Sequence, residues 1–416
     1  MAYDITAAAL AAKQASQAAS LLSTKEKNDA LTAISRILVQ QADSVLEANA
    51  IDLAQAKENG MPTVMQDRLL LTRERIEGIA SSVLDVVKLA DPIGQVVEGY
   101  RTVNGLNIQR VRVPMGVIGI IFESRPNVTV DAAVLCLKAG SAVLLRGGKE
   151  AFRSNLAFVR LMQQALEECG LPKELIQLVE DTSRETATKM MKLNGLLDVL
   201  IPRGGAGLIR SCVENATVPV IETGTGNCHI YVDATADLDM AVNIVFNAKT
   251  SRPSVCNAAE SLLVHRDVAQ AFLPICKKKL AEKNVEIRGC EETCKILGDL
   301  AVPATEEDYG KEYQDYIISC KVVGSVEEAI RHINHYSTGH SECIVTKDLE
   351  SADQFTAAVD SAAVYVNAST RFTDGGEFGL GAEIGISTQK LHARGPMGLK
   401  EMTTVKYVIR GNGQIR

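Results

Sequence analysis

The chain has 416 residues, which is enough for two or three domains with a large buried core. Hydrophobic residues make up 46% of the sequence and charged residues 23%, a composition that excludes the disordered and fibrous classes. The formal net charge of −7 is spread along the chain without a basic block, which argues against a nucleic acid as the main partner. We therefore expect a small substrate.

Ten cysteines stand at irregular positions without a CxxC pair, which favours a reducing compartment over a disulfide framework. Cys290 and Cys294 lack the second ligand pair that a structural zinc site needs, so we expect no metal. The segment from Met1 to Ala19 does not have the pattern of a signal peptide, and no run approaches 18 apolar residues. The sequence thus predicts a soluble, cytoplasmic protein with no membrane partner.

The first ninety residues have helical periodicity. Apolar side chains recur from Leu31 to Leu46, and Ser23 and Glu26 have the spacing of a capping box. We expect this helix to end near Gly60. The next segment, from Gln95 to Val113, contains Asn-Gly between short alternating runs, which predicts a β-hairpin that projects from the body.

From Gly116 onward, apolar β runs, glycine turns and helices alternate. Continuous apolar strands joined by helices indicate a parallel sheet covered on both faces, as in doubly wound dinucleotide-binding domains. The predicted strands of this series are GVIGIIFE, AVLLRGG, LIQLVED, VLIPRGG and VPVIETG.

A second βα series begins at His229 and predicts a second α/β domain. Its strands are expected near Ala259–Val264, Tyr316–Val322, Cys343–Val345 and Ala363–Val366. The C-terminal TTVKYVIRGNG alternates in polarity and is expected to pair either with the earlier hairpin or with a neighbouring subunit.

Cys256 lies in SRPSVCNAAE, on a connection between a helical run and an apolar strand. Such loops often carry function, and the neighbouring Arg252 would favour the nucleophilic thiolate. The residues alone leave a second interpretation open, in which Cys256 is a small buried hydrophobic side chain.

The ordered segments IFESRPNVT, LLRGGKEA, VLIPRGG, IETGTGN, SVCNAAE and NASTRFTDGGEFG resemble the aldehyde dehydrogenase superfamily over nearly the whole chain. Within it, SRPNVT, LLRGGKEA and IETGTGNCH are similar to the branch of γ-glutamyl phosphate reductases. The resemblance implies an α/β fold with a doubly wound cofactor domain, a second α/β catalytic domain and a small β oligomerisation element. The implied boundaries are 1–97, 114–228 and 372–400 for the cofactor domain, 229–371 for the catalytic domain, and 98–113 and 401–416 for the oligomerisation element.

The resemblance implies that Cys256 is the nucleophile and that the Asn127 amide helps to hold the oxyanion. The expected reaction is the NADPH-dependent reduction of L-glutamyl 5-phosphate to L-glutamate 5-semialdehyde through a Cys256 thioester, in proline biosynthesis. Without the resemblance, Asn127 could also cap a helix after Pro126. The alternative functions are an NADP-dependent aldehyde dehydrogenase that hydrolyses the thioester, and a non-catalytic member of the superfamily.

The cofactor region departs from the superfamily pattern. Arg146, Gly147 and Lys149 stand where oxidising members have Lys followed three residues later by an acid. Two cations favour the 2′-phosphate of NADPH, although Lys149 could simply begin a solvated helix.

Further cofactor contacts are implied for Arg203, Gly204 and Gly205 at a helix N-terminus, where the pyrophosphate would bind. Glu312 is expected at the nicotinamide ribose. Glu222, followed by Thr223 and Gly224, aligns with the glutamate that activates water in oxidising members. In a reductase Glu222 would instead move a proton, hold the cofactor or serve the structure.

An acyl phosphate with an amino-acid tail needs cations for its phosphate and carboxylate and an acid for its ammonium group. His340 is a candidate polar contact but is more easily explained as a structural histidine. The other candidates for substrate binding are Arg125, Arg252, Asn367, Ser369 and Arg371, with Asp374 or Glu377 for the ammonium. The hairpin and C-terminal strand imply a homo-oligomer, and the lability of the acyl phosphate leaves open an association with glutamate 5-kinase.

Overall fold

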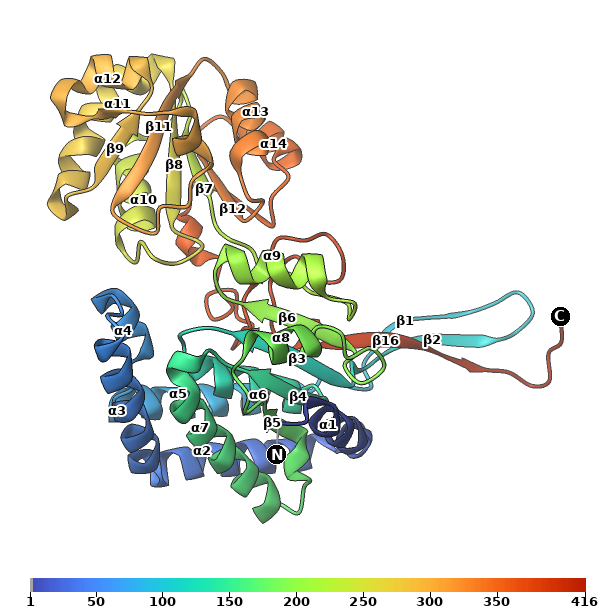
Figure 1. Cartoon of the computed structure of the whole chain (residues 1–416). Helices are drawn as coiled ribbons and strands as arrows, with labels where there is room; N and C mark the ends of the chain where they lie inside the picture. Colours follow the sequence, from blue (N-terminus) through green and yellow to red (C-terminus); the bar gives the residue numbers. More distant parts are fainter. Residues whose placement is uncertain (1–2) are drawn as a thin grey trace. The chain divides into compact units, whose positions relative to one another are not determined.

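The computed structural model describes residues 3–416, and the chain divides into two compact units. The first unit consists of Met1–Thr223, Gly379–Gly385 and Met397–Arg416, and the second of Gly224–Phe378 and Ile386–Pro396. In Figure 1, which is coloured by sequence, the first unit includes both the blue N-terminal helices and the last red strand.

The boundaries of these units differ in part from those expected for the domains. Residues 224–228, 372–378 and 386–396, which we assigned to the cofactor domain, belong to the second unit. The roles of the two units in cofactor binding and catalysis stay predictions.

Five helices form the N-terminal part of the first unit, and the capping box expected at Ser23 is confirmed. The Ser23 side chain accepts from the Glu26 N–H, and the Glu26 carboxylate accepts from the Ser23 N–H at 2.8 Å. The helices are α1 (Ile5–Ala19), α2 (Thr24–Gln40), α3 (Ala42–Glu58), α4 (Thr63–Leu69) and α5 (Arg73–Lys88).

The single helix expected from Leu31 to Gly60 is wrong, because α2 and α3 are separate helices. Gln41 leaves helical geometry, with φ −113° and ψ 26°, and joins the two. The apolar periodicity continues across this break, since Leu38, Ala42 and Val45 are all buried. A sequence pattern does not detect a one-residue break that keeps the buried face aligned.

A four-stranded parallel sheet forms the centre of the first unit, in the order β5-β4-β3-β6. Its strands are β3 (Val117–Phe122), β4 (Ala142–Arg146), β5 (Ile176–Leu178) and β6 (Val199–Arg203), and its connecting helices are α6 (Asn127–Lys138), α7 (Phe152–Glu168), α8 (Arg184–Met190) and α9 (Ala206–Asn215). The strand expected in VPVIETG is wrong, because that segment forms only an isolated bridge between Val220 and Leu200.

The predicted hairpin is confirmed as β1 (Val96–Arg101) and β2 (Asn107–Pro114), which pair antiparallel. Gly105 has φ +88° in the connecting turn, a conformation that glycine adopts without steric cost. The C-terminal strand β16 (Thr403–Arg410) pairs with β2 along its whole length, so the first of the two expected pairings is the one observed. The long, narrow sheet is visible in Figure 1.

The second unit contains a seven-stranded parallel sheet in the order β10-β9-β11-β8-β7-β12-β13. Its strands are β7 (Cys228–Val232), β8 (Ala259–His265), β9 (Glu286–Gly289), β10 (Val302–Pro303), β11 (Ile317–Val323), β12 (Ser341–Val345) and β13 (Ala363–Val366). Four of these were predicted near their observed positions, and β7 lies where the series was expected to begin, at His229, whereas β9 and β10 were missed.

Helices cover both faces of this second sheet. Ile230 and Val232 pack in one core with α10 (Leu238–Thr250), α11 (Arg266–Leu280) and α12 (Glu291–Leu297), whereas Tyr231 packs in another with α13 (Val326–Tyr336) and α14 (Leu349–Ala358). This arrangement explains why the strands are continuously apolar. A two-stranded ladder, β14 (Ile386–Ser387) with β15 (Gly395–Pro396), completes the unit.

Replacement of the α2 cap tests the N-terminal helices. We expect Ser23→Ala to lower the free energy of unfolding by about 1 kcal/mol, because the Glu26 N–H loses its acceptor. Urea unfolding followed by circular dichroism measures this change. Ser20→Ala, at an exposed position, is the control, and equal stability of the two variants would contradict the proposed contribution of the cap.

Candidate active site

Cys256 lies on the loop 251–258, between α10 and β8, and its side chain is half-buried. Most of the other cysteines are buried in packed cores, where burial raises the pKa of Cys276 and Cys343 to about 12. Those thiols stay protonated at neutral pH and contribute to packing. Cys256 differs in standing on a turn outside the strands and helices.

The backbone of Gly226 lies directly against the peptide of Cys256. A Cβ atom added at Gly226 would be 1.4 Å from the carbonyl oxygen of Cys256, so no side chain fits there. The same oxygen accepts from the thiol of Cys228, with Sγ at 3.2 Å. The segment that leads into β7 therefore forms a floor beneath Cys256.

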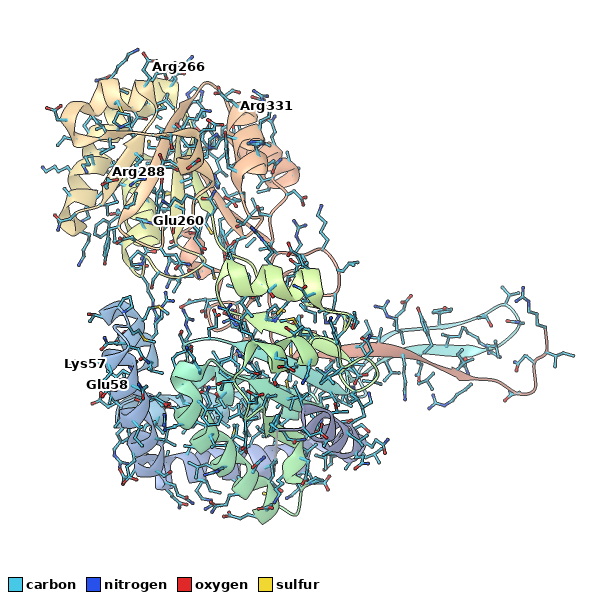
Figure 2. All side chains as sticks on the ribbon, in the orientation of Figure 1. Lys57, Glu58, Glu260, Arg266, Arg288 and Arg331 are labelled. Atoms are coloured by element: carbon cyan, nitrogen blue, oxygen red, sulfur yellow. The ribbon has the colours of Figure 1, made fainter. Side chains whose placement is uncertain are left out.

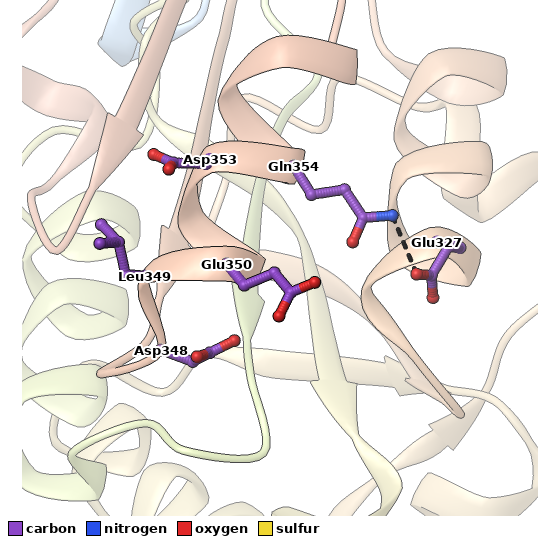
Figure 3. A pocket seen from close by; sticks show the side chains of 6 residues that line it. All are labelled: Glu327, Asp348, Leu349, Glu350, Asp353 and Gln354. Carbon is purple, nitrogen blue, oxygen red and sulfur yellow. Dashed lines mark hydrogen bonds between the residues drawn. The ribbon is translucent and has the colours of Figure 1, made fainter.

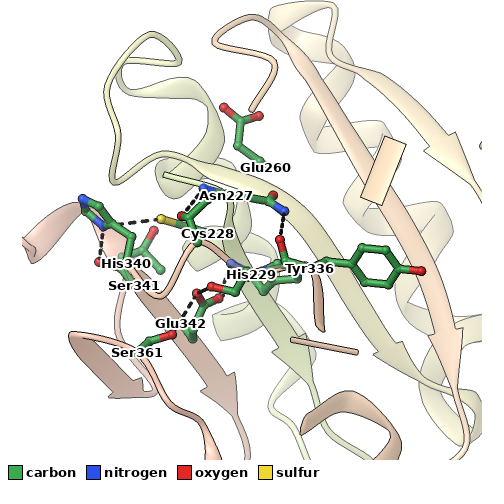
Figure 4. A network of polar contacts seen from close by, with 12 residues as sticks. Asn227, Cys228, His229, Glu260, Tyr336, His340, Ser341, Glu342 and Ser361 are labelled. Atoms are coloured by element: carbon green, nitrogen blue, oxygen red, sulfur yellow. Dashed lines mark hydrogen bonds and ion pairs between the residues drawn. The ribbon is translucent and has the colours of Figure 1, made fainter. Parts of the chain in front are cut away.

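Side chains from another part of the second unit hold this floor in place, as Figure 4 shows in part. The Gly226 N–H donates to Oε1 of Glu312 at 2.9 Å, and the Asn227 N–H donates to the Thr338 hydroxyl at 3.0 Å. The His229 N–H donates to Glu342 at 2.6 Å. Two segments of the chain, one with Glu312 and one with Thr338 and Glu342, thus fix the position of one short stretch of backbone.

Arg371 joins the two ends of the Cys256 loop. Its Nε donates to the Ser251 hydroxyl at 2.9 Å, and its Nη1 donates to the Asn257 side chain. Burial, and after it the charge of Arg252, lower the pKa of Arg371. Two guanidinium groups therefore lie close to one another beside the thiol, a setting that favours both a thiolate and an anionic substrate.

Asn127 is the first residue of α6, and its side chain does not cap the helix. Pro126 occupies the N-cap position, so the capping alternative is wrong. The Asn127 amide instead donates through Nδ2 to Asp131 at 2.9 Å. An amide nitrogen carries two N–H groups, so this bond orients the amide while a second donor remains. Burial raises the pKa of Asp131 to about 6.

Arg146 and Lys149 differ in whether their charged groups already have partners in the chain. Arg146 Nη2 donates to the carbonyl of Thr182 at 2.6 Å, which ties the guanidinium to the loop after β5. Lys149 is exposed and makes no ion pair with any residue of the described part of the chain. It begins a short 3₁₀ turn, Lys149–Ala151, that runs into α7. Of the two cations, Lys149 is the one whose charge is available to a ligand.

The turn between Arg146 and Lys149 has no room for side chains. A Cβ at Gly147 would lie 2.1 Å from Nδ2 of Asn155, and one at Gly148 would lie 2.1 Å from Oε1 of Glu150. Glu150 accepts from the N–H of Ser124 at 2.8 Å, and Ser124 has φ +53°. This acid therefore stabilises an unusual backbone conformation three residues before Asn127.

The turn Arg203-Gly204-Gly205 precedes α9, as expected for an anion-binding helix N-terminus. The Gly205 N–H donates to Oε2 of Glu123 at 3.1 Å. The sequence did not point to this acid, which takes the place that a phosphate oxygen would occupy. A pyrophosphate bound at Gly205 would have to replace the Glu123 carboxylate.

The remaining cofactor candidates fall in both units. Glu222 is half-buried, and the Thr223 hydroxyl donates to the carbonyl of Pro202 at 2.7 Å. The Gly224 N–H donates to the carbonyl of Ile386 at 2.9 Å. Glu312 holds Gly226 with one carboxylate oxygen, which leaves its other oxygen for a ribose. The cofactor contacts of all four residues stay predictions.

Comparison with known proteins identifies the family. The aldehyde dehydrogenase family matches residues 1–296 and 302–408. This chain belongs to that family. Its members are oxidoreductases that use a nicotinamide cofactor, and the doubly wound units described above fit this fold.

Several γ-glutamyl phosphate reductases are similar to this aldehyde dehydrogenase family member over nearly its whole length. The enzyme of Clostridium perfringens strain 13 is 62% identical over 405 residues, which cover 97% of each chain. That of Heliobacterium modesticaldum is 60% identical over 97% of each chain. The crystal structure of the enzyme from Thermotoga maritima matches with a TM-score of 0.96 and 50% identity, over 99% of each chain.

Most of the side chains expected to bind the substrate already make hydrogen bonds within this family member. Asn367 has φ +57°, and its amide pairs with both the N–H and the carbonyl of Thr346 at 2.9 Å. Ser369 is buried and accepts from the Arg371 N–H at 3.3 Å. His340 is fully buried, with Nδ1 at 2.8 Å from the Ser341 hydroxyl, which favours the structural interpretation. Arg125 is half-buried, and Arg252 is exposed.

Gly226, Cys228, Thr338 and Glu342 were missed as functional residues. All four lie in two segments, IETGTGNCH and STGHSEC, in which only Glu222–Gly224 and His340 were singled out. The proximity of these segments to Cys256 depends on strand order, which a single sequence does not reveal.

Figure 3 shows a hollow in the second unit that contains none of the predicted site residues. Four acids line it, together with Leu349 and Gln354, and Gln354 donates to Glu327 at 2.9 Å. Its negative charge disfavours an acyl phosphate or a dinucleotide. Within residues 3–416, no group of three or more His, Cys, Asp or Glu side chains could hold a metal ion, and no helix has the length and apolarity needed to cross a membrane.

Substitution of Gly226 tests the floor beneath Cys256. We expect Gly226→Ala to lower turnover about 100-fold, because a displacement of about 1 Å in reacting groups can cost that much. Steady-state kinetics on folded protein measures the effect. Gly78→Ala is the control, since a Cβ there meets nothing within 4 Å. Turnover of Gly226→Ala at the wild-type level would show that the close contact does not matter.

Proposed function

We propose that this chain reduces L-glutamyl 5-phosphate to L-glutamate 5-semialdehyde and phosphate in proline biosynthesis, with NADPH as the reductant. The observation that carries the proposal is Cys256, held on a half-buried loop between two arginines, in a chain 62% identical to a γ-glutamyl phosphate reductase. The reaction requires a nucleophile, an oxyanion site and a cation for the phosphate.

The proposed first step is attack of the Cys256 thiolate on the acyl carbon of the substrate. A C–S bond forms, the C–O bond to phosphate breaks, and inorganic phosphate leaves with the electron pair. Splitting acyl transfer from reduction is the usual advantage of covalent catalysis. Arg252 and Arg371 support this step, because their charges stabilise both the thiolate and the leaving phosphate.

The oxyanion that forms during this attack would accept from the backbone N–H of Cys256 and from the Asn127 amide. A single donor of this kind contributes about 2.7 to 4 kcal/mol to catalysis. Asp131 holds one N–H of that amide and so fixes the direction of the other. Since Cys256 and Asn127 belong to different units, their cooperation is part of the proposal.

Lys149 would bind the 2′-phosphate of NADPH, with Gly147 providing a backbone that a ligand can approach closely. Arg146, which donates to the carbonyl of Thr182, would help to hold the same loop in place. The turn at Gly204 and Gly205, Glu222 with Thr223 and Gly224, and Glu312 would supply the remaining contacts. NADPH, when bound, supplies the hydride that reduces the Cys256 thioester. Collapse of the Cys256 hemithioacetal then releases the semialdehyde.

Arg125, Arg252 and Arg371 are the proposed partners of the substrate's phosphate and α-carboxylate, and Asp374 or Glu377 of its ammonium group. Asn367 and Ser369 are retained as weaker candidates, because their polar atoms already bond within the chain. Glu222 is proposed to serve proton transfer or cofactor binding, since hydrolysis of the thioester would waste the acyl phosphate.

We further propose that the chain forms a homo-oligomer in the cytoplasm through the sheet of β1, β2 and β16. Large apolar side chains on this sheet are unusually exposed, among them Tyr407 at 59% and Ile409 at 57%. An association with glutamate 5-kinase would protect the labile acyl phosphate.

The requirement for phosphate tests the proposed function. In the reverse direction, we expect oxidation of glutamate 5-semialdehyde by NADP⁺ only when inorganic phosphate is present, because phosphate must accept the acyl group. Cys256→Ala should lower this rate at least about 1,000-fold. Cys169→Ala, an exposed cysteine, is the matched control.

The absorbance of NADPH measures the rate of oxidation with and without phosphate. Oxidation without phosphate would favour the hydrolysing alternative, and near-normal turnover of Cys256→Ala would overturn the thioester mechanism.

Lys149 is the test of cofactor preference. We expect Lys149→Ala to raise the KM for NADPH about tenfold while leaving that for NADH within about twofold, because a charge-assisted hydrogen bond to the 2′-phosphate is lost. Steady-state kinetics with both cofactors measures the preference. Lys57→Ala, another exposed lysine of the first unit (Figure 2), is the control. An equal effect on both cofactors would contradict the assignment.

A further inference from the structure

A buried ion pair joins the two ends of the Cys256 loop. Lys249 is in the last turn of α10, and Glu260 is the second residue of β8. The Nζ of Lys249 lies 2.6 Å from Oε2 of Glu260, and both side chains are 0% exposed. The loop 251–258 therefore starts and ends at this pair.

A β-bulge places the Glu260 side chain. In the ladder between β7 and β8, Cys228 pairs with Ala259 and His229 pairs with Ser261, so Glu260 is the extra residue. A bulge of this kind redirects a side chain from the regular alternation, and bulges are common beside active sites. Glu260 is labelled in Figure 4, beside the strand that carries Cys228.

Glu260 also contacts the segment that carries Glu312. Its Oε1 accepts from the N–H of Gln314 at 3.2 Å, where Gln314 has φ +56°. Glu312 in turn accepts from the N–H of Gly226, which lies against the Cys256 peptide. One carboxylate thus connects both ends of the nucleophile loop with the floor beneath it.

Burial of the Lys249–Glu260 pair destabilises the folded state, because both charges lose their contact with water. Burial raises the pKa of Glu260 to about 7, against the opposing charge of Lys249, and lowers the pKa of Lys249. Apolar replacement of a buried ion pair is often neutral or stabilising in proteins. Stability therefore does not explain two buried charges at this position, whereas a requirement for one loop geometry does.

We infer that Lys249 and Glu260 are positioning residues for the nucleophile, which hold the Cys256 loop in its reactive conformation through their ion pair. The inference rests on the proposed function only in naming the reaction that depends on Cys256. Both side chains are fully buried and so out of reach of a bound ligand, and their effect is therefore expected in the reactivity of the thiol and in kcat rather than in KM.

The test is a double variant, Lys249→Met with Glu260→Gln, in the full-length protein. Glutamine keeps an acceptor for the Gln314 N–H, whereas the two charges and the hydrogen bond from Lys249 are removed. We expect a thermal midpoint near the wild-type value, kcat at least about tenfold lower and KM within about twofold. The rate of Cys256 alkylation by iodoacetamide, followed by peptide mass spectrometry, should change at least about threefold.

The matched control is Lys27→Met with Asp91→Asn. This pair is also buried, at 1% and 9% exposure, and its asparagine keeps an acceptor for the Ile93 N–H. Lys27 is in α2 and Asp91 follows α5, and neither is among the proposed catalytic or binding residues, so we expect their replacement to leave kcat and Cys256 alkylation unchanged.

If the double variant does not fold, Glu260→Asp replaces it, because this change keeps both charges but shortens the carboxylate by one methylene. An unchanged rate of Cys256 alkylation in either folded variant would overturn the inference. Alkylation needs no substrate, so a wild-type protein inactive toward glutamyl phosphate would refute the proposed function and leave this test intact.

Discussion

The contact between Gly226 and the Cys256 carbonyl is the constraint on which the second unit depends. Because no side chain fits at this contact, the strand leading into β7 must run directly beneath the loop. Its N–H groups are then buried, and buried N–H groups need acceptors. Glu312, Thr338 and Glu342 provide them from distant positions. One close approach thus accounts for polar residues in two separate segments.

The first unit uses acids in a similar way. Glu150 holds the strained Ser124 before Asn127, and Glu123 holds the N–H of Gly205 before α9. These carboxylates fix loops at the carboxyl ends of parallel strands, where ligands of such sheets bind. They also leave Lys149 as a charge without an ion pair among the described residues. An anion is therefore favoured at Lys149 over the turn at Gly205, where the Glu123 carboxylate already lies.

Much of the fold could be predicted because local signals agreed with the tertiary structure. The Ser23 and Glu26 cap, the Asn-Gly hairpin and the apolar strands from Val117 to Arg203 all carry such signals. Cys256 could be singled out from its loop and its family resemblance. The bulge at Glu260 and its pairing with Lys249 could not, because the register of β7 against β8 is decided by packing between residues far apart in the sequence, such as Cys228 and Ala259.

The pairing of β16 with β2 has a consequence for synthesis. Residues 403–410 emerge from the ribosome only after the whole second unit, yet they complete a sheet that begins at residue 96. Until then β2 has an open edge next to apolar side chains, the kind of surface that promotes aggregation. The intervening second unit can form its own sheet in the meantime, because all its strands are already present. The nascent chain thus carries one finished unit and one that waits for its final strand.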